Sequence, residues 1–98
     1  MSSPAFHRIH IFGASGSGTT TLGTAVAQRL GVLQLESDDF YWVDTPLQPY
    51  STKRPPAERV ALMQARLQGQ GSWVISGGSL ADWGQPLVPQ FTQVVFLH

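Results

Sequence analysis

The feature that most constrains this 98-residue sequence is a glycine-rich stretch between an apolar segment and a helical pattern. It runs from Gly13 to Thr20 and reads Gly-Ala-Ser-Gly-Ser-Gly-Thr-Thr. Glycines let the backbone turn so that successive N–H groups converge on phosphate oxygens, and the dipole of a following helix adds partial positive charge. The stretch therefore predicts a phosphate-binding loop with a strand before it and a helix after it.

The residues on either side of the loop have the patterns that this arrangement requires. Segment 8–12 is rich in β-favouring residues and stops at Gly13, which is typical of a buried parallel strand. A helical pattern runs from about Thr19 to Leu30, and Gly31 follows as a helix stop. Its apolar residues are expected to form one stripe: Leu22, Ala25, Val26 and Leu30.

The remaining segments predict an α/β fold. Segments 32–35, 73–76 and 94–97 have strand patterns, and Pro56 is placed to open a second helix with an apolar stripe. The members of that stripe are Val60, Met63 and Leu67. Prolines between 36 and 56 exclude a regular element there, so we expect a long loop. Alternating strands and helices imply parallel pairing and a three-layer sandwich with about four strands.

We expect residues 1–98 to form a single domain, and the N-terminal part of a longer one. The last strand pattern ends directly before His98, whereas domains tend to end in loosely held surface residues. An incomplete sheet would leave an uncovered edge, which favours association into oligomers.

Composition limits the classes of partner. Six basic and six acidic side chains cancel, so no overall field is available to hold nucleic acid or a membrane surface. The chain has no cysteine, no signal-peptide pattern at its start and no apolar run near the roughly 20 residues of a transmembrane helix. We therefore expect a soluble, cytoplasmic protein that binds anions locally.

One position departs from the phosphate-loop pattern. Its seventh place, where the pattern requires lysine, is Thr19, whereas Thr20 keeps the hydroxyl that coordinates Mg²⁺. Losing one preorganised donor typically costs about 10²–10³ in rate, so we expect binding to survive better than catalysis. Lys53 is the only lysine in the chain. The residues expected to hold the nucleotide are Gly13, Ala14, Ser15, Gly16, Ser17, Gly18, Thr19, Thr20 and Thr21.

Two other readings of the loop stay open. A glycine- and serine-rich stretch can be a plain flexible turn. It can also be a dinucleotide-binding turn, because Gly13, Gly16 and Gly18 loosely echo its glycines and Glu36 lies where a ribose-binding acid would sit. In the register that starts at Gly16, however, the last glycine is replaced by Thr21.

Three segments together carry a more specific resemblance: the loop from Gly13 to Gly23, segment 37–42 (Ser-Asp-Asp-Phe-Tyr-Trp) and segment 74–78 (Val-Ile-Ser-Gly-Gly). They resemble the adenylate kinase-like and shikimate kinase-like branch of the P-loop small-molecule kinases, over nearly the whole chain. Segment 38–41 looks like the corresponding part of uridine and nicotinamide riboside kinases. The resemblance implies a P-loop NTPase fold, ATP and Mg²⁺ as cofactors, and phosphoryl transfer to a small-molecule acceptor.

The resemblance also implies roles for acidic and glycine residues. Asp38 would orient or deprotonate the acceptor hydroxyl, or hold Mg²⁺ together with Thr20, and Asp39 would lie beside it at the substrate. The alternative is that both are solvated loop acids. Gly77 and Gly78 look like a turn that admits substrate close to the backbone, or they form an ordinary turn after a strand.

Cations and aromatic rings complete the candidate site. Arg54, the candidate catalytic arginine, and Lys53 would hold an anionic group of the acceptor, although surface charge is the alternative. Tyr41, with Trp42 and Trp83, would stack on a base or sugar, or pack in the fold. The resembling kinases carry an arginine-bearing lid beyond the region matched here. A nucleotide-binding protein without transferase activity is therefore the second hypothesis.

Overall fold

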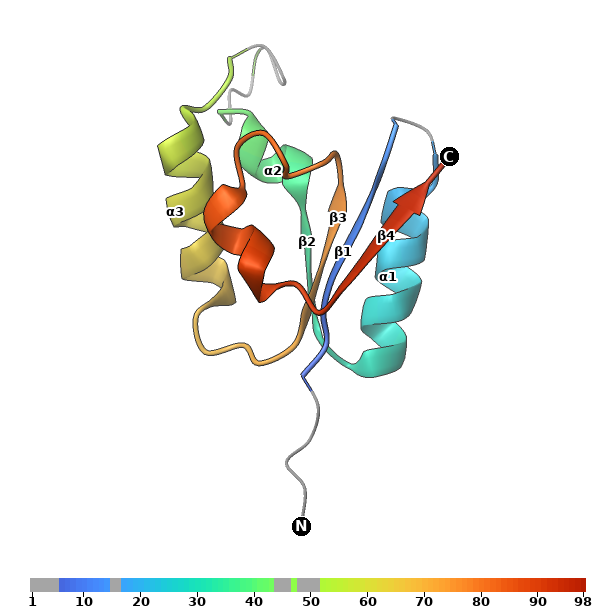
Figure 1. The fold of residues 1–98 in the computed structure, drawn as a ribbon. Helices are drawn as coiled ribbons and strands as arrows, with labels where there is room; N and C mark the ends of the chain where they lie inside the picture. Colours follow the sequence, from blue (N-terminus) through green and yellow to red (C-terminus); the bar gives the residue numbers. More distant parts are fainter. Residues whose placement is uncertain (1–5, 15–16, 44–46, 48–51) are drawn as a thin grey trace.

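The computed structural model describes residues 6–14, 17–43, 47 and 52–98. Its elements in chain order are β1 (Arg8–Gly13), α1 (Thr19–Leu30), β2 (Leu33–Glu36), α2 (Ser37–Tyr41), α3 (Pro56–Leu67), β3 (Trp73–Gly77), the 3₁₀ helix η1 (Gln85–Gln90) and β4 (Gln93–Leu97). The strands form one sheet in the order β2-β3-β1-β4, and every neighbouring pair is parallel. Helix α1 covers one face of the sheet and α3 lies on the other (Figure 1). The predicted α/β fold with a four-stranded parallel sheet is confirmed.

Two apolar cores lie on the two faces of the sheet. The larger core lies between the sheet and the α2, α3 and η1 side, and its buried members are Leu35, Phe40, Met63, Leu67, Trp73, Ile75, Leu80 and Leu87. The smaller core lies under α1 and consists of Ile9, Ile11, Ala27 and Val74. Strand β3 contributes to both because alternate side chains point to opposite faces, and all five of its residues are buried.

Local signals predicted most element boundaries to within one residue, but the stripe on α1 was partly wrong. Ala25 and Leu30 are exposed, and the buried residues of α1 are Thr19, Gly23 and Ala27. The reason is that α1 lies very close to the sheet at Gly23, where only a glycine fits. The helix therefore rests on its small residues, and Leu22 and Val26 only flank the core.

The expectation that segment 36–56 contains no regular element was wrong. Residues Ser37–Tyr41 form α2, directly after β2, and Trp42 pairs with Lys53 in an isolated antiparallel bridge. None of the prolines of this segment lies within 37–41, so nothing prevented a short helix there. Helix η1 was also not predicted. It contains Pro86 and Pro89, which argue against an α-helix but fit a short 3₁₀ helix.

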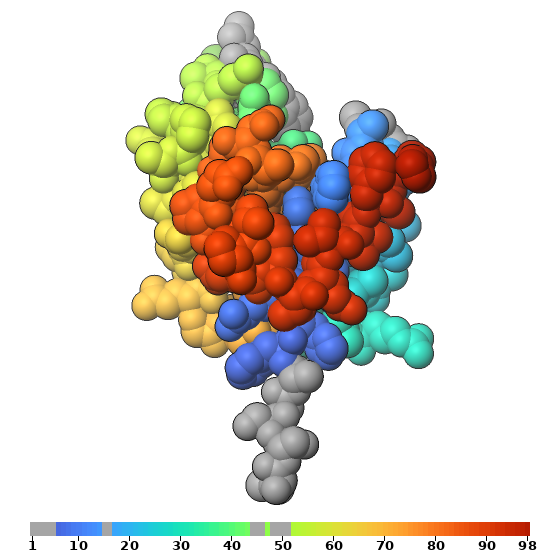
Figure 2. Space-filling model, viewed as in Figure 1, coloured from blue at the N-terminus to red at the C-terminus, as the bar shows by residue number. Residues whose placement is uncertain are grey.

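Strand β4 forms one edge of the sheet. Its Val94 and Phe96 side chains are 57% and 54% exposed. In the space-filling view, atoms of β1 (blue) are visible between β4 (red) and the segment that follows β3 (orange) (Figure 2).

Within the described residues, no helix is long and apolar enough to cross a membrane.

Candidate functional site

The glycine loop joins the carboxyl end of β1 to the first turn of α1. Gly18 immediately precedes the helix with φ of 93°, a left-handed conformation that glycine adopts readily. The Gly18 carbonyl accepts the Leu22 N–H at 3.0 Å, and the Ser17 N–H donates to the Ala14 carbonyl at 3.0 Å. Ser15 and Gly16, which were predicted to bind phosphate, lie outside the described residues. The first turn of α1 thus lies beside the carboxyl end of β1, which is the arrangement that a phosphate-binding loop requires.

A hollow of about 220 Å³ lies at this end of the sheet. It is lined by Gly13, Ala14, Thr19, Thr20, Glu36, Asp38, Gly77 and Gly78. These residues come from the carboxyl ends of β1, β2 and β3 and from the first turns of α1 and α2. Ligands of open parallel sheets bind outside the carboxyl ends of the strands, where neighbouring connections diverge. We call this space the loop hollow.

A second hollow of about 290 Å³ adjoins the first. It is lined by Ser37, Asp38, Tyr41, Trp42, Gly78, Ser79 and Trp83, and we call it the aromatic hollow. Asp38 and Gly78 line both hollows, and Asp38 is exposed. The structure thus brings Asp38, Tyr41 and Gly78 together with the glycine loop. Asp39 and Thr21 are exposed and line neither of the two hollows.

The turn after β3 is joined to the start of α2. The Gly78 N–H donates to the buried Ser37 hydroxyl at 2.8 Å. Gly77 has φ of 121°, and a Cβ atom placed there would collide with the same hydroxyl. Both the conformation and the close approach therefore require glycine, which brings the β3 turn against the segment that carries Asp38.

Glu36 is a site residue that the sequence indicated only for the dinucleotide reading. One of its carboxylate oxygens, Oε1, accepts the Ser76 hydroxyl at 2.5 Å and the Gln34 amide at 3.4 Å. The Gln34 amide also donates to the Ser76 hydroxyl at 3.1 Å, while the Thr24 hydroxyl donates to the Gln34 carbonyl at 3.0 Å. This network joins α1, β2 and β3 below the loop hollow and holds the Glu36 carboxylate in its wall. The sequence signal was the polar pair Gln34 and Glu36 on a buried strand.

Arg59 on α3 is a second residue that sequence reasoning missed. It is only 6% exposed, and its guanidinium carbon lies 4.0 Å from the ring centroid of Tyr41 and 5.5 Å from that of Trp83. Its Nε atom donates to the Arg54 carbonyl at 2.6 Å. Both rings line the aromatic hollow, so a stacked cation lies behind that hollow. The available signal was helical spacing, because Arg59 lies one turn before Met63 on the buried stripe.

Arg54, the candidate catalytic arginine, contacts the backbone at the end of α2. Its guanidinium donates to the Phe40 and Trp42 carbonyls, at 3.2 and 3.1 Å, and so holds the end of α2. It lines neither the loop hollow nor the aromatic hollow. The Lys53 ammonium lies 5.7 Å from the Tyr41 ring centroid, at the aromatic side. A direct catalytic role of Arg54 stays a prediction, and its observed contacts are structural.

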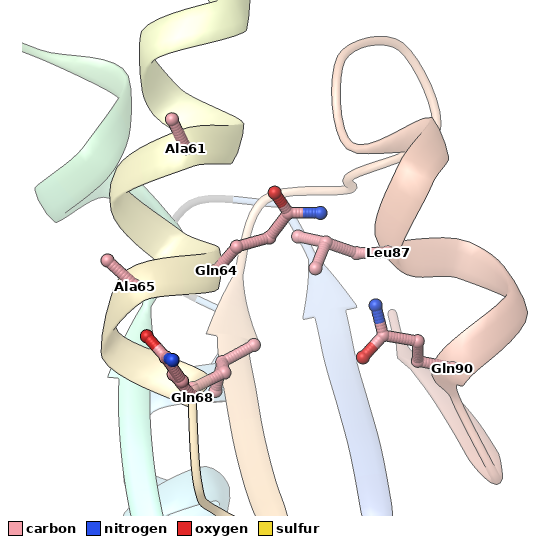
Figure 3. Close-up of a pocket in the computed structure, with 7 residues that line it drawn as sticks. Ala61, Gln64, Ala65, Gln68, Leu87 and Gln90 are labelled. Atoms are coloured by element: carbon pink, nitrogen blue, oxygen red, sulfur yellow. The ribbon is translucent and has the colours of Figure 1, made fainter.

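A third hollow, of about 460 Å³, lies between α3 and η1, and Gln64 extends from α3 toward Leu87 of η1 (Figure 3). Its lining residues are Ala61, Gln64, Ala65, Leu67, Gln68, Leu87 and Gln90. None of these side chains ionises, so this hollow offers neither an acid nor a base. The candidate site is therefore the pair of hollows that share Asp38.

Comparison with known proteins finds a relative by sequence and a similar fold among the solved structures. No family model matches the chain. The uncharacterized protein YqaC of Bacillus subtilis (strain 168) is 42% identical over 89 residues, which is 91% of this chain. The chain spans about half of that relative, namely 47% of its length. The unliganded crystal structure of a sugar kinase from Janibacter sp. HTCC2649 matches 94% of this chain and 58% of its own, with a TM-score of 0.55 and 21% identity. The chain therefore has a kinase-like α/β fold.

Proposed function

We propose that this chain carries the nucleotide- and acceptor-binding part of a P-loop kinase, of the adenylate kinase-like and shikimate kinase-like branch. The reaction would transfer the γ-phosphoryl group of ATP to a small hydroxylated acceptor. The observation that carries the proposal is the shared position of Asp38, which lies in the walls of both the loop hollow and the aromatic hollow. A carboxylate between a phosphate site and a second cavity is placed to orient an acceptor hydroxyl toward the phosphate.

The donor set of the loop hollow fits Mg²⁺ and phosphate. Backbone N–H groups of the glycine loop and of the first turn of α1 would hold phosphate oxygens. Mg²⁺ is usually held by one or two carboxylates, a hydroxyl, water and the phosphates themselves. Thr20, Glu36 and Asp38 line the hollow and supply such oxygen donors. Bound Mg²⁺ would neutralise charge on the transferring phosphoryl group.

The aromatic hollow suits a ring-bearing or sugar-like acceptor. The Tyr41 and Trp83 rings offer flat apolar walls, while Asp38 and Ser79 offer polar groups. Arg59, stacked on both rings, adds a positive charge behind them. One solved structure with a similar fold is a sugar kinase, which agrees with a hydroxylated acceptor.

A second candidate function is nucleotide binding without transfer. Thr19 occupies the lysine place of the loop and is buried. Within the part of the chain that the structure describes, no lysine or arginine lines the loop hollow. Without a cation on the β- and γ-phosphates, phosphoryl transfer would be slowed more than binding.

Calorimetry with Mg²⁺-ATP and Mg²⁺-ADP, together with a screen for ADP release over hydroxylated acceptors, tests both candidates. Gly18→Val should abolish nucleotide binding, because Gly18 has positive φ. Asp38→Asn should keep nucleotide binding and lose turnover, and the charge-matched control Glu58→Gln, at an exposed position of α3, should change neither. Binding without turnover in the unmodified protein would favour the second candidate. Binding of NAD(P) but not of ATP would refute both.

A further inference from the structure

His10 is a buried, polar residue in the middle of β1, and it touches both ends of the turn after β3. It is only 3% exposed. Its Nδ1 atom lies 3.0 Å from the carbonyl oxygen of Ile75, inside β3, and its Nε2 atom accepts the N–H of Leu80 at 3.4 Å. The four residues between these contacts include Gly77, Gly78 and Ser79, all of which line the candidate site. The imidazole therefore spans the base of the turn that forms part of both hollows.

Only one protonation form of the imidazole satisfies both contacts. A carbonyl oxygen accepts hydrogen bonds only, so Nδ1 must carry the proton. A backbone amide donates only, so Nε2 must be unprotonated. The neutral Nδ1–H tautomer meets both requirements. A second proton on Nε2 would place two donors against each other and leave the buried Leu80 N–H without its acceptor.

The surroundings of His10 favour this neutral form. The ring centroid of Phe12 lies 5.3 Å from that of the imidazole, and the ring centroid of Phe91 lies 5.0 Å from it. Burial lowers the pKa of His10 below its usual value, and the hydrogen bond to Ile75 only partly opposes this shift. Burial and the two hydrogen-bond contacts taken together therefore favour the neutral imidazole at neutral pH.

The charged groups on the elements around His10 contact other residues and not its imidazole. On β1, Arg8 donates to the Gly71 carbonyl. On α3, the Arg59 guanidinium lies on the Tyr41 and Trp83 rings. On β2, the Glu36 carboxylate bonds to Ser76. Before α3, the half-buried Arg54 donates to the Phe40 and Trp42 carbonyls, and the half-buried Tyr41 has Arg59 on its ring. Other ionisable groups of these elements and of the adjoining segments are exposed: His7, Asp38, Asp39, Lys53, Glu58, Arg66, Asp82 and His98.

We propose that His10 is a positioning residue. Its neutral imidazole holds segment 76–79, which is the end of β3 and the two residues after it, against the two hollows. Protonation of Nε2 releases this segment and weakens nucleotide binding. We call the two contacts of the imidazole, with the Ile75 carbonyl and the Leu80 N–H, the clamp. The clamp itself is a property of the fold. The effect on nucleotide binding rests on the proposed function. No catalytic contact is required of His10, which acts only through Gly77 and Gly78.

Nuclear magnetic resonance of the ¹⁵N-labelled protein, from pH 8 down to the pH at which the protein unfolds, tests the clamp without any ligand. The imidazole should titrate from the Nδ1–H tautomer, and the amide signals of Gly77, Gly78 and Leu80 should shift with the same midpoint. The control His98→Gln should leave these shifts unchanged. If His10 titrates while the Leu80 amide stays fixed, the clamp is refuted.

Two substitutions test the consequence for binding. In His10→Gln the side-chain carbonyl replaces Nε2 as acceptor for Leu80 but does not titrate, whereas His10→Phe removes both contacts. Calorimetry with Mg²⁺-ATP should show a loss of affinity of about three- to tenfold in His10→Phe at neutral pH, the effect of one hydrogen bond.

The unmodified protein should lose affinity on acidification, relative to His10→Gln, since the titration of ATP itself is common to both proteins. Equal pH dependence in the two proteins would overturn the proposal. If Mg²⁺-ATP does not bind at neutral pH, the proposed function and the binding effect both fail, and the amide titration still decides the clamp. Because that titration uses the unmodified chain, it gives a result even if His10→Phe does not fold.

Discussion

A single methyl group added at Gly23 tests how closely α1 packs on β3. A Cβ atom at this position would lie 2.7 Å from the Ser76 hydroxyl oxygen, 2.8 Å from the Ser76 Cβ and 3.0 Å from the Gln34 amide nitrogen. Ser76 is fully buried in β3 and cannot turn away without leaving Glu36. The helix must therefore move away from the sheet.

The size of the effect follows from two opposing terms. Overpacking a close contact typically costs about 1–3 kcal/mol, and this contact is with a fully buried β-carbon, so the upper half of that range applies. Replacing glycine by alanine inside a helix returns up to about 1 kcal/mol. Gly23→Ala should therefore lower the free energy of unfolding by about 1–2 kcal/mol, measured by urea denaturation with fluorescence of the buried Trp73 as the signal.

Gly31→Ala is the matched control on the same helix. Gly31 has positive φ and open space around it, so its substitution should cost about 1–2 kcal/mol through backbone strain alone. Only Gly23→Ala should also weaken Mg²⁺-ATP binding, because it moves α1, whose Thr19 and Thr20 line the loop hollow, away from the sheet. In the double variant Gly23→Ala/Ser76→Gly the two effects should be less than additive. A Gly23→Ala protein as stable as the unmodified one, or strictly additive effects, would refute this account of the packing.

The other predictions concern the core, the turn and pH. Met63→Ala should lower the free energy of unfolding by about 2–5 kcal/mol in urea denaturation, because Met63 is fully buried, and the exposed Gln64→Ala should change it little. Ser37→Ala should cost about 1–3 kcal/mol in the same assay by removing the acceptor of the Gly78 N–H, and loss of only a few tenths would contradict that bond. Because the folded pKa of His10 is lowered, the unfolded chain binds the extra proton first. Stability should therefore be full above the unfolded pKa of about 6.5 and fall as pH drops below it, and His10→Gln should flatten the thermal-denaturation profile between pH 5 and 7.

Elements with local signals were predicted well. Helix α1 begins after Gly18 and ends before Gly31. Both glycines have a left-handed conformation, which glycine adopts readily and which commonly ends a helix at its carboxyl terminus. Helix α3 begins at Pro56 because proline suits the first turn. Such boundaries depend on residues within a few positions of one another, so the sequence pattern was sufficient.

Features that depend on close approach between distant segments were not predicted. The stripe on α1 was placed on its large apolar residues, whereas the helix meets β3 through Gly23. Arg54 was chosen as the functional arginine, whereas Arg59 stacks on the rings of the aromatic hollow. A helical pattern says which residues share a face, but not which residues of other elements that face meets.

The sequence by itself determined that a glycine loop lies between β1 and α1, because backbone conformation and helix termini are local properties of Gly13 to Thr20. That Asp38 lies beside this loop was expected only from the family resemblance, and the tertiary structure decided it. Strand β3 lies between β1 and β2, and parallel pairing aligns the carboxyl ends of the three strands at one edge of the sheet. The Gly77 turn then packs against Ser37 and brings α2 to the side of the glycine loop. These contacts join residues about 20 to 65 positions apart, and only the packed sheet brings them together.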